Sequence, residues 1–205
     1  MSPTRTKAES NEGKDFDGAY GWRNRSAVVR EKNVLEARVK IDGLTGLFNR
    51  SYFNTLCDVM QNNPDVKAIG IILVDVDYFK EYNDLYGRLQ GDELLRRVAL
   101  CLDENGDSRF FAARYGGDEF ICLCVNTEKE EIESYLKRVY EDLRLAHIEH
   151  ATSPAASLAT VSIGYSLFDN DEALIWKLPS RWRIRTYQAK NQRKKPNTAA
   201  AYRLC

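Results

Sequence analysis

The sequence lacks the features that would place it in a membrane or on a secretory route. No apolar run approaches the roughly 20 residues of a membrane-spanning helix, and the N-terminus has no signal-peptide core. Net charge is also absent, because 30 Lys and Arg residues balance 30 Asp and Glu residues. Such a chain has no overall field that draws it to nucleic acid. We therefore expect a cytoplasmic protein that neither enters a membrane nor binds nucleic acid.

Cysteine and histidine patterns are similarly uninformative. The five cysteines show neither paired spacing nor a Cys-x-x-Cys pattern, which favours reduced thiols. Cys122 and Cys124 alternate along an apolar run, and we expect both on one core-facing side of a strand. We expect the only histidines, His147 and His150, at the surface. No Gly-x-x-x-x-Gly-Lys-Ser/Thr loop occurs, which argues against a P-loop nucleotidase.

The chain divides into a leader, a linker helix and one domain. Residues 1–25 are polar and aperiodic, as is typical of disorder. Residues 26–41 are helix formers with a thin apolar stripe, which predicts a docking or paired helix that is too short for a convincing coiled coil. Residues 42–205 are enough for one α/β domain.

Hydrophobic periodicity predicts the elements of this domain. Apolar residues at helical spacing predict helices at about 50–61, 91–102, 129–145 and 182–192. Continuous or alternating apolar runs predict strands at 67–75, 109–113, 120–125, 159–167 and 200–204. The order βα-ββ-αβ indicates a split βαβ core, so the expected fold class is α/β (α+β), a central mixed sheet with flanking helices.

Residues 114–120 read Arg-Tyr-Gly-Gly-Asp-Glu-Phe and join two strand-like runs. Glycine accepts the positive φ angles of tight hairpin turns, so Gly116 and Gly117 predict a hairpin. Asp118 and Glu119 then put adjacent carboxylates at the turn, where they repel each other unless a cation lies between them. Small residues beside paired carboxylates suit a site where Mg²⁺ and a polyphosphate approach the backbone. A solvated acidic hairpin tip is the alternative.

A second acidic segment closes the buried strand upstream. By alternation, Asp75 and Asp77 share one face of the strand end. A carboxylate there is unfavourable unless paired or metal-bound, so Asp75 is the better ligand candidate and Asp77 is a candidate cap of the following turn. If this strand lies beside the hairpin, Asp75 and Asp118 reach one sheet edge and offer hard oxygen ligands to Mg²⁺. Alternatively, both acids simply mark the strand end.

The next residues suit a guanine nucleotide. The turn at Tyr78-Phe79-Lys80 offers backbone N–H groups and one cation to phosphates. Asn83 and Asp92 are a suitable pair for guanine, because an amide can pair with its O6 and N3 edges while a carboxylate accepts from N1–H and the 2-amino group. Such a site rejects adenine, since its buried polar groups would be left unpaired.

Together these segments resemble the GGDEF diguanylate cyclase family. The resemblance covers about residues 42–204, with motifs in the family's order at 42–50, 75–80, 83–84, 91–92, 114–120 and 161–164. It implies a nucleotidyl cyclase or polymerase-palm-like fold. It also implies a homodimer that condenses two GTP molecules into cyclic di-GMP and two pyrophosphates. Each domain would hold one GTP, so dimer geometry would control the rate. The helix at 26–41 would be an input helix open to an upstream sensory partner.

The resemblance also implies roles for single residues. Asp75, Asp118 and the carbonyl of Val76 would bind Mg²⁺ or Mn²⁺, with Glu119 as a further ligand or charge stabiliser. Asp118 is equally a candidate base for the attacking hydroxyl, and the sequence leaves ligand and base open. Asn83 and Asp92 would bind guanine. The phosphates would be held by Phe79, Lys80, Lys190 and one of Arg193 and Lys194.

Some segments depart from the family pattern. Asp107 and Phe110 replace the Arg and Asp of the product-inhibition motif, so we expect no product-inhibition site. The stretch 182–190 matches its family motif only at the end, and basic residues replace a following Gly-Arg-Asn. A catalytically inactive domain that binds GTP or a protein remains the main alternative. A single-strand nucleic-acid binder using the basic patch 181–195 would explain neither carboxylate pair.

Overall fold

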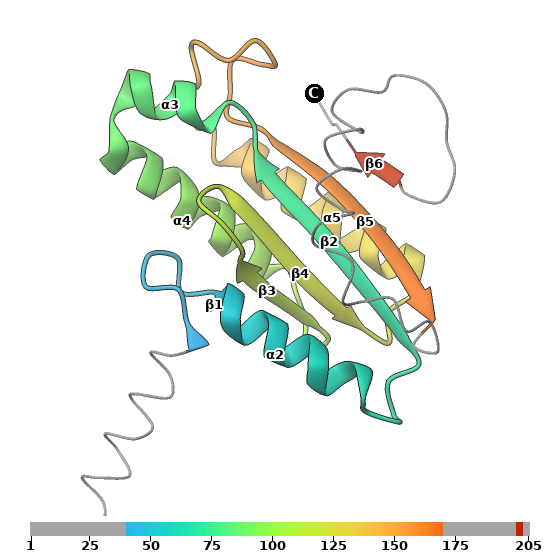
Figure 1. Cartoon of the computed structure of the whole chain (residues 1–205). Helices are drawn as coiled ribbons and strands as arrows, with labels where there is room; N and C mark the ends of the chain where they lie inside the picture. The colour runs from blue at the N-terminus through green and yellow to red at the C-terminus, as the bar shows by residue number, and fades with distance from the viewer. Residues whose placement is uncertain (1–39, 170–199, 203–205) are drawn as a thin grey trace, which may run out of the picture. The chain divides into compact units, whose positions relative to one another are not determined.

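A six-stranded mixed sheet forms the centre of the domain, with the strand order β1-β3-β4-β2-β5-β6 (Figure 1). The strands are β1 (Phe48–Asn49), β2 (Ala68–Val76), β3 (Phe110–Arg114), β4 (Glu119–Val125), β5 (Val161–Asp169) and β6 (Ala200–Tyr202). β1 runs parallel to β3, and all other neighbouring strands are antiparallel. This arrangement confirms the predicted α/β class with its split βαβ core.

The computed structural model describes residues 40–169 and 200–202, which belong to one compact unit, Lys40–Cys205. The predicted leader, nearly all of the linker helix, and the helix expected at 182–192 lie outside the described residues. Lys190, Arg193 and Lys194 lie outside them as well. None of the described helices is long and apolar enough to cross a membrane.

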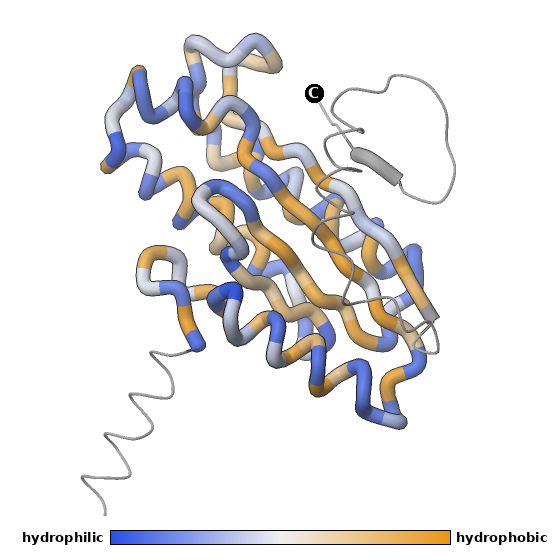
Figure 2. Tube along the Cα trace, in the orientation of Figure 1, coloured by the Kyte–Doolittle hydropathy of each residue, from blue (hydrophilic) through white to orange (hydrophobic). Residues whose placement is uncertain are grey.

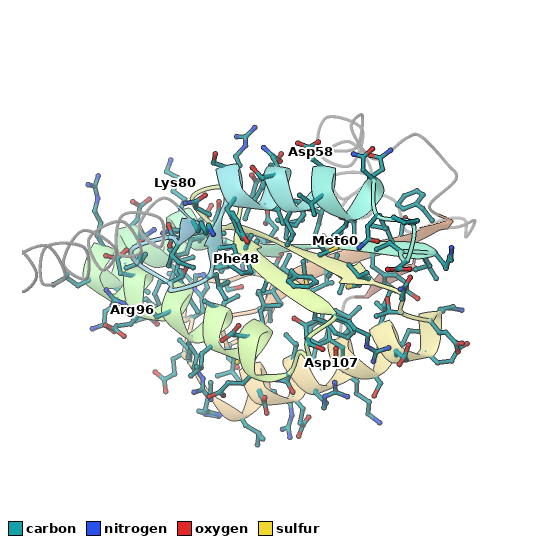
Figure 3. The ribbon with its side chains drawn as sticks, turned by 90° about the horizontal axis from the view of Figure 1, so that it is seen from below. Phe48, Asp58, Met60, Lys80, Arg96 and Asp107 are labelled. Carbon is teal, nitrogen blue, oxygen red and sulfur yellow. The ribbon has the colours of Figure 1, made fainter. Side chains whose placement is uncertain are left out.

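Four described helices pack on or beside the sheet. They are α2 (Arg50–Gln61), α3 (Phe79–Tyr86), α4 (Arg88–Glu104) and α5 (Lys129–Leu145). Viewed along the sheet, α2 covers one face, while α4 and α5 cover the other (Figure 3). The bounds of α2 and α5 match the prediction, because both helices carry a clear apolar stripe and a start signal. The Asn49 side chain accepts from the Tyr52 N–H at the start of α2, and Glu128 and Glu131 form a capping box at α5.

The central strands separate two apolar clusters. Phe120, Cys122 and Cys124 of β4 pack with α4 and α5, whereas Ile121 and Leu123 pack with α2. This confirms that the two cysteines share one core-facing side. Figure 2 shows hydrophobic residues concentrated along the strands, whereas the helices carry a mixture of hydrophobic and hydrophilic residues.

Apart from shifts of a few residues at the ends of some elements, three features of the fold differ from the sequence-based expectations. The two-residue β1 was not predicted, since so short a strand carries no periodicity. The turn expected at residues 78–80 is the start of α3, an eight-residue helix. His150 was expected at the surface together with His147, but it is only 1% exposed, because a loop folds it against α3.

Candidate active site

The two predicted acidic segments meet at one end of the sheet. Asp75 of β2 lies directly opposite Glu119 of β4 in the antiparallel register. One residue further, the Val76 N–H donates to the carbonyl of Asp118 at 3.2 Å. Side chains directly opposite in an antiparallel pair point to the same face, with Cβ atoms about 5 Å apart. The register therefore places Glu119 as the immediate neighbour of Asp75, with Asp118 at the adjoining position of the turn.

This donor set fits a magnesium ion better than a protein-enclosed metal. Among the residues that the structure describes, no group of three or more His, Cys, Asp or Glu side chains could hold a metal ion. Mg²⁺ is usually bound by one or two carboxylates and completes its octahedron with waters and substrate phosphates. Like charges directly opposite each other also destabilise a sheet, and a cation removes that penalty. Asp75 and its neighbour Glu119 supply two carboxylates at this strand end, the number that such an ion usually takes from a protein.

The hairpin uses its glycines differently from the prediction. The described glycines with positive φ are Gly46 and Gly87, so neither Gly116 nor Gly117 needs that conformation. The N–H groups of Tyr115 and Gly116 both donate to the Glu119 carbonyl, which closes the turn. A Cβ on Gly116 would lie 2.8 Å from Oε2 of Glu119, whereas one on Gly117 would meet open space. A side chain at residue 116 would therefore require the Glu119 carboxylate to shift, whereas one at residue 117 would not.

An ion pair holds this hairpin to the start of the domain. Arg114 donates from Nη2 to the Gly117 carbonyl at 2.7 Å, and its Nη1 lies 3.3 Å from Oδ1 of Asp42. The same Asp42 oxygen accepts from the backbone N–H and the hydroxyl of Thr45. Burial alone would raise the Asp42 pKa, but the bonds from Thr45 and the Arg114 guanidinium outweigh it and lower the pKa. Sequence reasoning used Asp42 only as a motif marker, and no local signal reveals a partner so far along the chain.

The segment after β2 presents a helix start at the same end of the sheet. Tyr78 precedes α3 in the left-handed conformation, with φ 55° and ψ 35°, and no side chain caps the helix. The first-turn N–H groups at Phe79 and Lys80 therefore belong to an uncapped helix N-terminus, which favours anions. Lys80 is exposed at this end (Figure 3). These are the residues that the sequence predicted to contact phosphates.

Asp77 links the end of β2 to the start of β5. It is buried, and its carboxylate accepts hydrogen bonds from Thr160 Oγ1 at 2.8 Å and Ser162 Oγ at 2.6 Å. The residue at the helix start is Tyr78, without a side-chain bond. The hydroxyls of Thr160 and Ser162 thus bind one Asp77 oxygen each, and the role of Asp77 as a cap stays a prediction. Asp77 thereby fixes the end of β2 to β5.

Asn83 and Asp92 come together where α3 meets α4. Asn83 lies on α3 and Asp92 in the first turns of α4, and both are partly buried. A Cβ on Gly91 would overlap the Asn83 amide and lie 3.3 Å from the Phe79 ring. Gly91 thus lets the two helices approach closely, so that the residue beside Asp92 contacts Asn83. The two residues that were predicted to bind guanine therefore both lie at the contact between α3 and α4.

The positions of the family's product-inhibition motif hold a local ion cluster. Arg109 lies 2.8 Å from Asp107 and 2.9 Å from Glu131 of α5. Phe110 stacks on Tyr135 with 4.6 Å between the ring centroids. Asp107 lies at the opposite end of the domain from Lys80 (Figure 3). At the position where the motif has an arginine, this chain thus has Asp107, which forms an ion pair with Arg109.

Known proteins are similar to this chain in sequence. The family model for the diguanylate cyclase GGDEF domain matches residues 39–196. The diguanylate cyclase DgcN of Escherichia coli is 35% identical over 171 residues, covering 80% of this chain and 40% of DgcN. The cyclic di-GMP phosphodiesterase PdeR of Escherichia coli is 37% identical over 121 residues, covering 57% of this chain and 18% of PdeR. The chain therefore spans less than half the length of these curated relatives.

Solved structures show the same fold. The coiled coil and GGDEF domain of DgcB from Caulobacter crescentus, crystallised with c-di-GMP, superposes with a TM-score of 0.74 at 23% identity. That match covers 84% of this chain and 92% of the DgcB chain. With the Gly-Gly-Asp-Glu-Phe hairpin beside the β2 carboxylate and a family match over most of its length, this chain belongs to the diguanylate cyclase GGDEF-domain family.

Proposed function

We propose that this protein is a diguanylate cyclase that condenses two GTP molecules into cyclic di-GMP and two pyrophosphates. The observation that carries the proposal is the register of β2 and β4, in which Asp75 lies opposite Glu119 and Val76 bonds to Asp118. Two segments from different parts of the sequence thereby bring carboxylates to one sheet end. Carboxylates gathered in this way suit a nucleoside triphosphate that is bound together with its divalent cation.

The neighbouring residues support a guanine nucleotide as the substrate. The N–H groups at the start of α3 and the Lys80 ammonium suit the β- and γ-phosphates. Lys190 and one of Arg193 and Lys194 are proposed as further phosphate ligands. Asn83 and Asp92 would bind the guanine edge, and an adenine would leave both groups unpaired.

In the proposed reaction, the 3′-hydroxyl of one GTP attacks the α-phosphorus of the other, and pyrophosphate leaves. Bound Mg²⁺ or Mn²⁺, held by Asp75, Asp118 and the Val76 carbonyl, would supply charge neutralisation for the attacking and leaving oxygens. Glu119 would be a further ligand or stabilise the charge from beside Asp75. Asp118 would either bind the ion or accept the hydroxyl proton.

A single domain provides one guanine-binding pair, so the reaction requires two domains facing each other. We propose a homodimer whose rate is set by how often the two sites meet. The linker helix at 26–41 is proposed to influence this pairing and to connect to an upstream sensory partner. A cytoplasmic location follows from the proposed substrate.

Product analysis tests the proposal. The purified chain is incubated with GTP and Mg²⁺, and the nucleotides are resolved by anion-exchange chromatography. We expect cyclic di-GMP and pyrophosphate in a one-to-two ratio, no product with ATP, and none after chelation. Asp75→Asn and Glu119→Gln should lose at least about a hundredfold in rate, as is typical for removing a charge-stabilising group. A rate that rises more steeply than enzyme concentration would identify the dimer as the active form.

A non-catalytic GTP-binding or protein-interaction module is the second candidate. The similarity to PdeR, a protein named as a phosphodiesterase, favours this alternative. The same experiment separates the two functions. Magnesium-dependent GTP binding without product, at protein concentrations that give a dimer, would establish the non-catalytic role and overturn the cyclase proposal.

A further inference from the structure

The buried histidine His150 holds the backbone at the start of α3. Its ring nitrogen Nε2 lies 3.1 Å from the carbonyl oxygen of Tyr78. A carbonyl oxygen can only accept, so Nε2 carries the hydrogen and donates it. The ring also meets Tyr82 edge to face, with 5.2 Å between the centroids. His150 thus contacts both the residue that precedes α3 and the buried Tyr82 ring of α3.

The polar character of this side chain is not required for packing. Its second nitrogen, Nδ1, is buried and has no hydrogen-bond partner among the described residues. Burying an unpaired polar atom costs free energy that an apolar side chain of similar size would avoid. The bond to Tyr78 is therefore the feature that distinguishes a histidine from a leucine or a methionine at this position.

The loop that carries His150 is itself well anchored. The His150 N–H donates to the Ser157 carbonyl, and the Ser153 N–H donates to the His150 carbonyl. The Ala151 N–H donates to the Tyr86 hydroxyl at 3.0 Å, at the far end of α3. Figure 1 shows this loop, between α5 and β5, beside α3. These hydrogen bonds hold the loop, and with it the His150 imidazole, in place.

The Tyr78 carbonyl has a direct connection to the proposed phosphate site. Because the peptide bond is planar and trans, the Tyr78 carbonyl and the Phe79 N–H point in opposite directions and rotate together. Tyr78 also has an unfavourable left-handed backbone for a bulky residue, so this peptide needs external restraint. The carbonyl accepts from Tyr82 N–H as well, at 3.0 Å, which begins the helix. Fixing the oxygen fixes the direction of the Phe79 N–H.

We infer that His150 is a positioning residue for triphosphate binding: it holds the Tyr78–Phe79 peptide so that the N–H groups at the start of α3 face the substrate. The inference rests on the proposed function, because it assigns the same helix start to the β- and γ-phosphates. His150 acts through the backbone and does not contact the nucleotide.

Two variants of similar size separate the hydrogen bond from the packing. His150→Gln keeps an amide donor at the distance of Nε2, whereas His150→Met fills the same space without a donor. Affinity is measured by calorimetry with Mg²⁺ and α,β-methylene-GTP, in which the bond to the leaving group cannot be cleaved. We expect about tenfold weaker binding for His150→Met, the effect of one hydrogen bond. His150→Gln should stay within about threefold of the unchanged protein.

Controls make each outcome decisive. His147→Asn changes the exposed histidine, at a left-handed position that asparagine tolerates, and should bind like the unchanged protein. Thermal unfolding is recorded for every variant, because a merely structural role would make affinity follow stability in both substitutions. Equal affinities for His150→Gln and His150→Met overturn the inference. If His150→Met does not fold, Tyr86→Phe replaces it, because this variant removes the hydroxyl that binds the Ala151 N–H. We expect about threefold weaker binding of the analogue. Unchanged binding would overturn the inference.

Binding by the unchanged protein separates a failure of the proposed function from a failure of the positioning role. If it does not bind the analogue, the proposed function itself fails. If it binds and the His150 variants bind equally well, only the positioning role fails.

Discussion

Arg114 and Asp42 are 72 residues apart in the sequence, yet Nη1 of the arginine lies 3.3 Å from Oδ1 of the aspartate. The arginine also holds the Gly117 carbonyl, and the aspartate also holds Thr45. The first loop of the domain is thereby joined to the acidic hairpin. Because both side chains are largely shielded from solvent, this pair should matter more for stability than the exposed ion pairs.

Asp42→Asn should destabilise the fold and loosen the hairpin. The substitution removes the charge that pairs with Arg114, and we expect a loss of about 1–2 kcal/mol in the free energy of unfolding. Urea titration followed by circular dichroism measures it. The matched control is Glu141→Gln, which breaks an exposed pair with Arg144 on α5 and should leave the midpoint unchanged. Equal midpoints for the two variants would contradict the role given to Asp42.

The Asp42 contribution should depend on pH in one direction. Its pKa is lowered in the folded protein from an ordinary value of 3.8, so its stabilisation is fully present above that value. It is lost as the pH falls through the lower, folded-state pKa, where the carboxylate becomes protonated in both states. The stability difference between the unchanged protein and Asp42→Asn should therefore shrink on acidification below 3.8. A difference that grows under acid would reverse the assigned sign.

Gly116→Ala and Gly117→Ala should have different effects although the residues are adjacent. Neither glycine has a positive φ, so alanine strains neither backbone. The new methyl group on residue 116 would displace the Glu119 carboxylate, while that on residue 117 would meet no atom. We expect about tenfold weaker magnesium-dependent GTP binding for Gly116→Ala, as for one lost charge-assisted bond, and a smaller loss for Gly117→Ala. Unfolding curves should stay close to that of the unchanged protein.

Gly91→Ala should weaken guanine recognition without unfolding the domain. The added methyl group would overlap the Asn83 amide and force it out of its present position. Alanine also favours a helix interior over glycine by about 1 kcal/mol, which offsets part of the packing strain. We expect the preference for GTP over ATP to fall, as measured by competition binding. Gly43→Ala, whose methyl group would contact nothing, is the control, and equal nucleotide preference in both variants would exclude the proposed contact.

Several parts of the site were predictable because their signals are local. The apolar stripe of α5 and the continuous apolar run of β2 predicted those elements closely, since periodicity reflects burial of one face or both. The convergence of Asp75 with the hairpin followed from placing neighbouring strands in one sheet. The length of α3 was missed, because a single short helix next to a strand end resembles a turn.

By itself, the sequence determined the fold class, the order of the longer helices and strands, and which acidic side chains lie at the strand ends, because hydrophobic spacing and residue type are properties of each segment alone. Only the tertiary structure decided the register that sets Glu119 opposite Asp75, the burial of His150 against Tyr78, and the bond from Arg114 to Asp42. Each of these depends on which distant segments pack together. Such packing depends on the whole core, so the residues next to these positions in the sequence do not predict it.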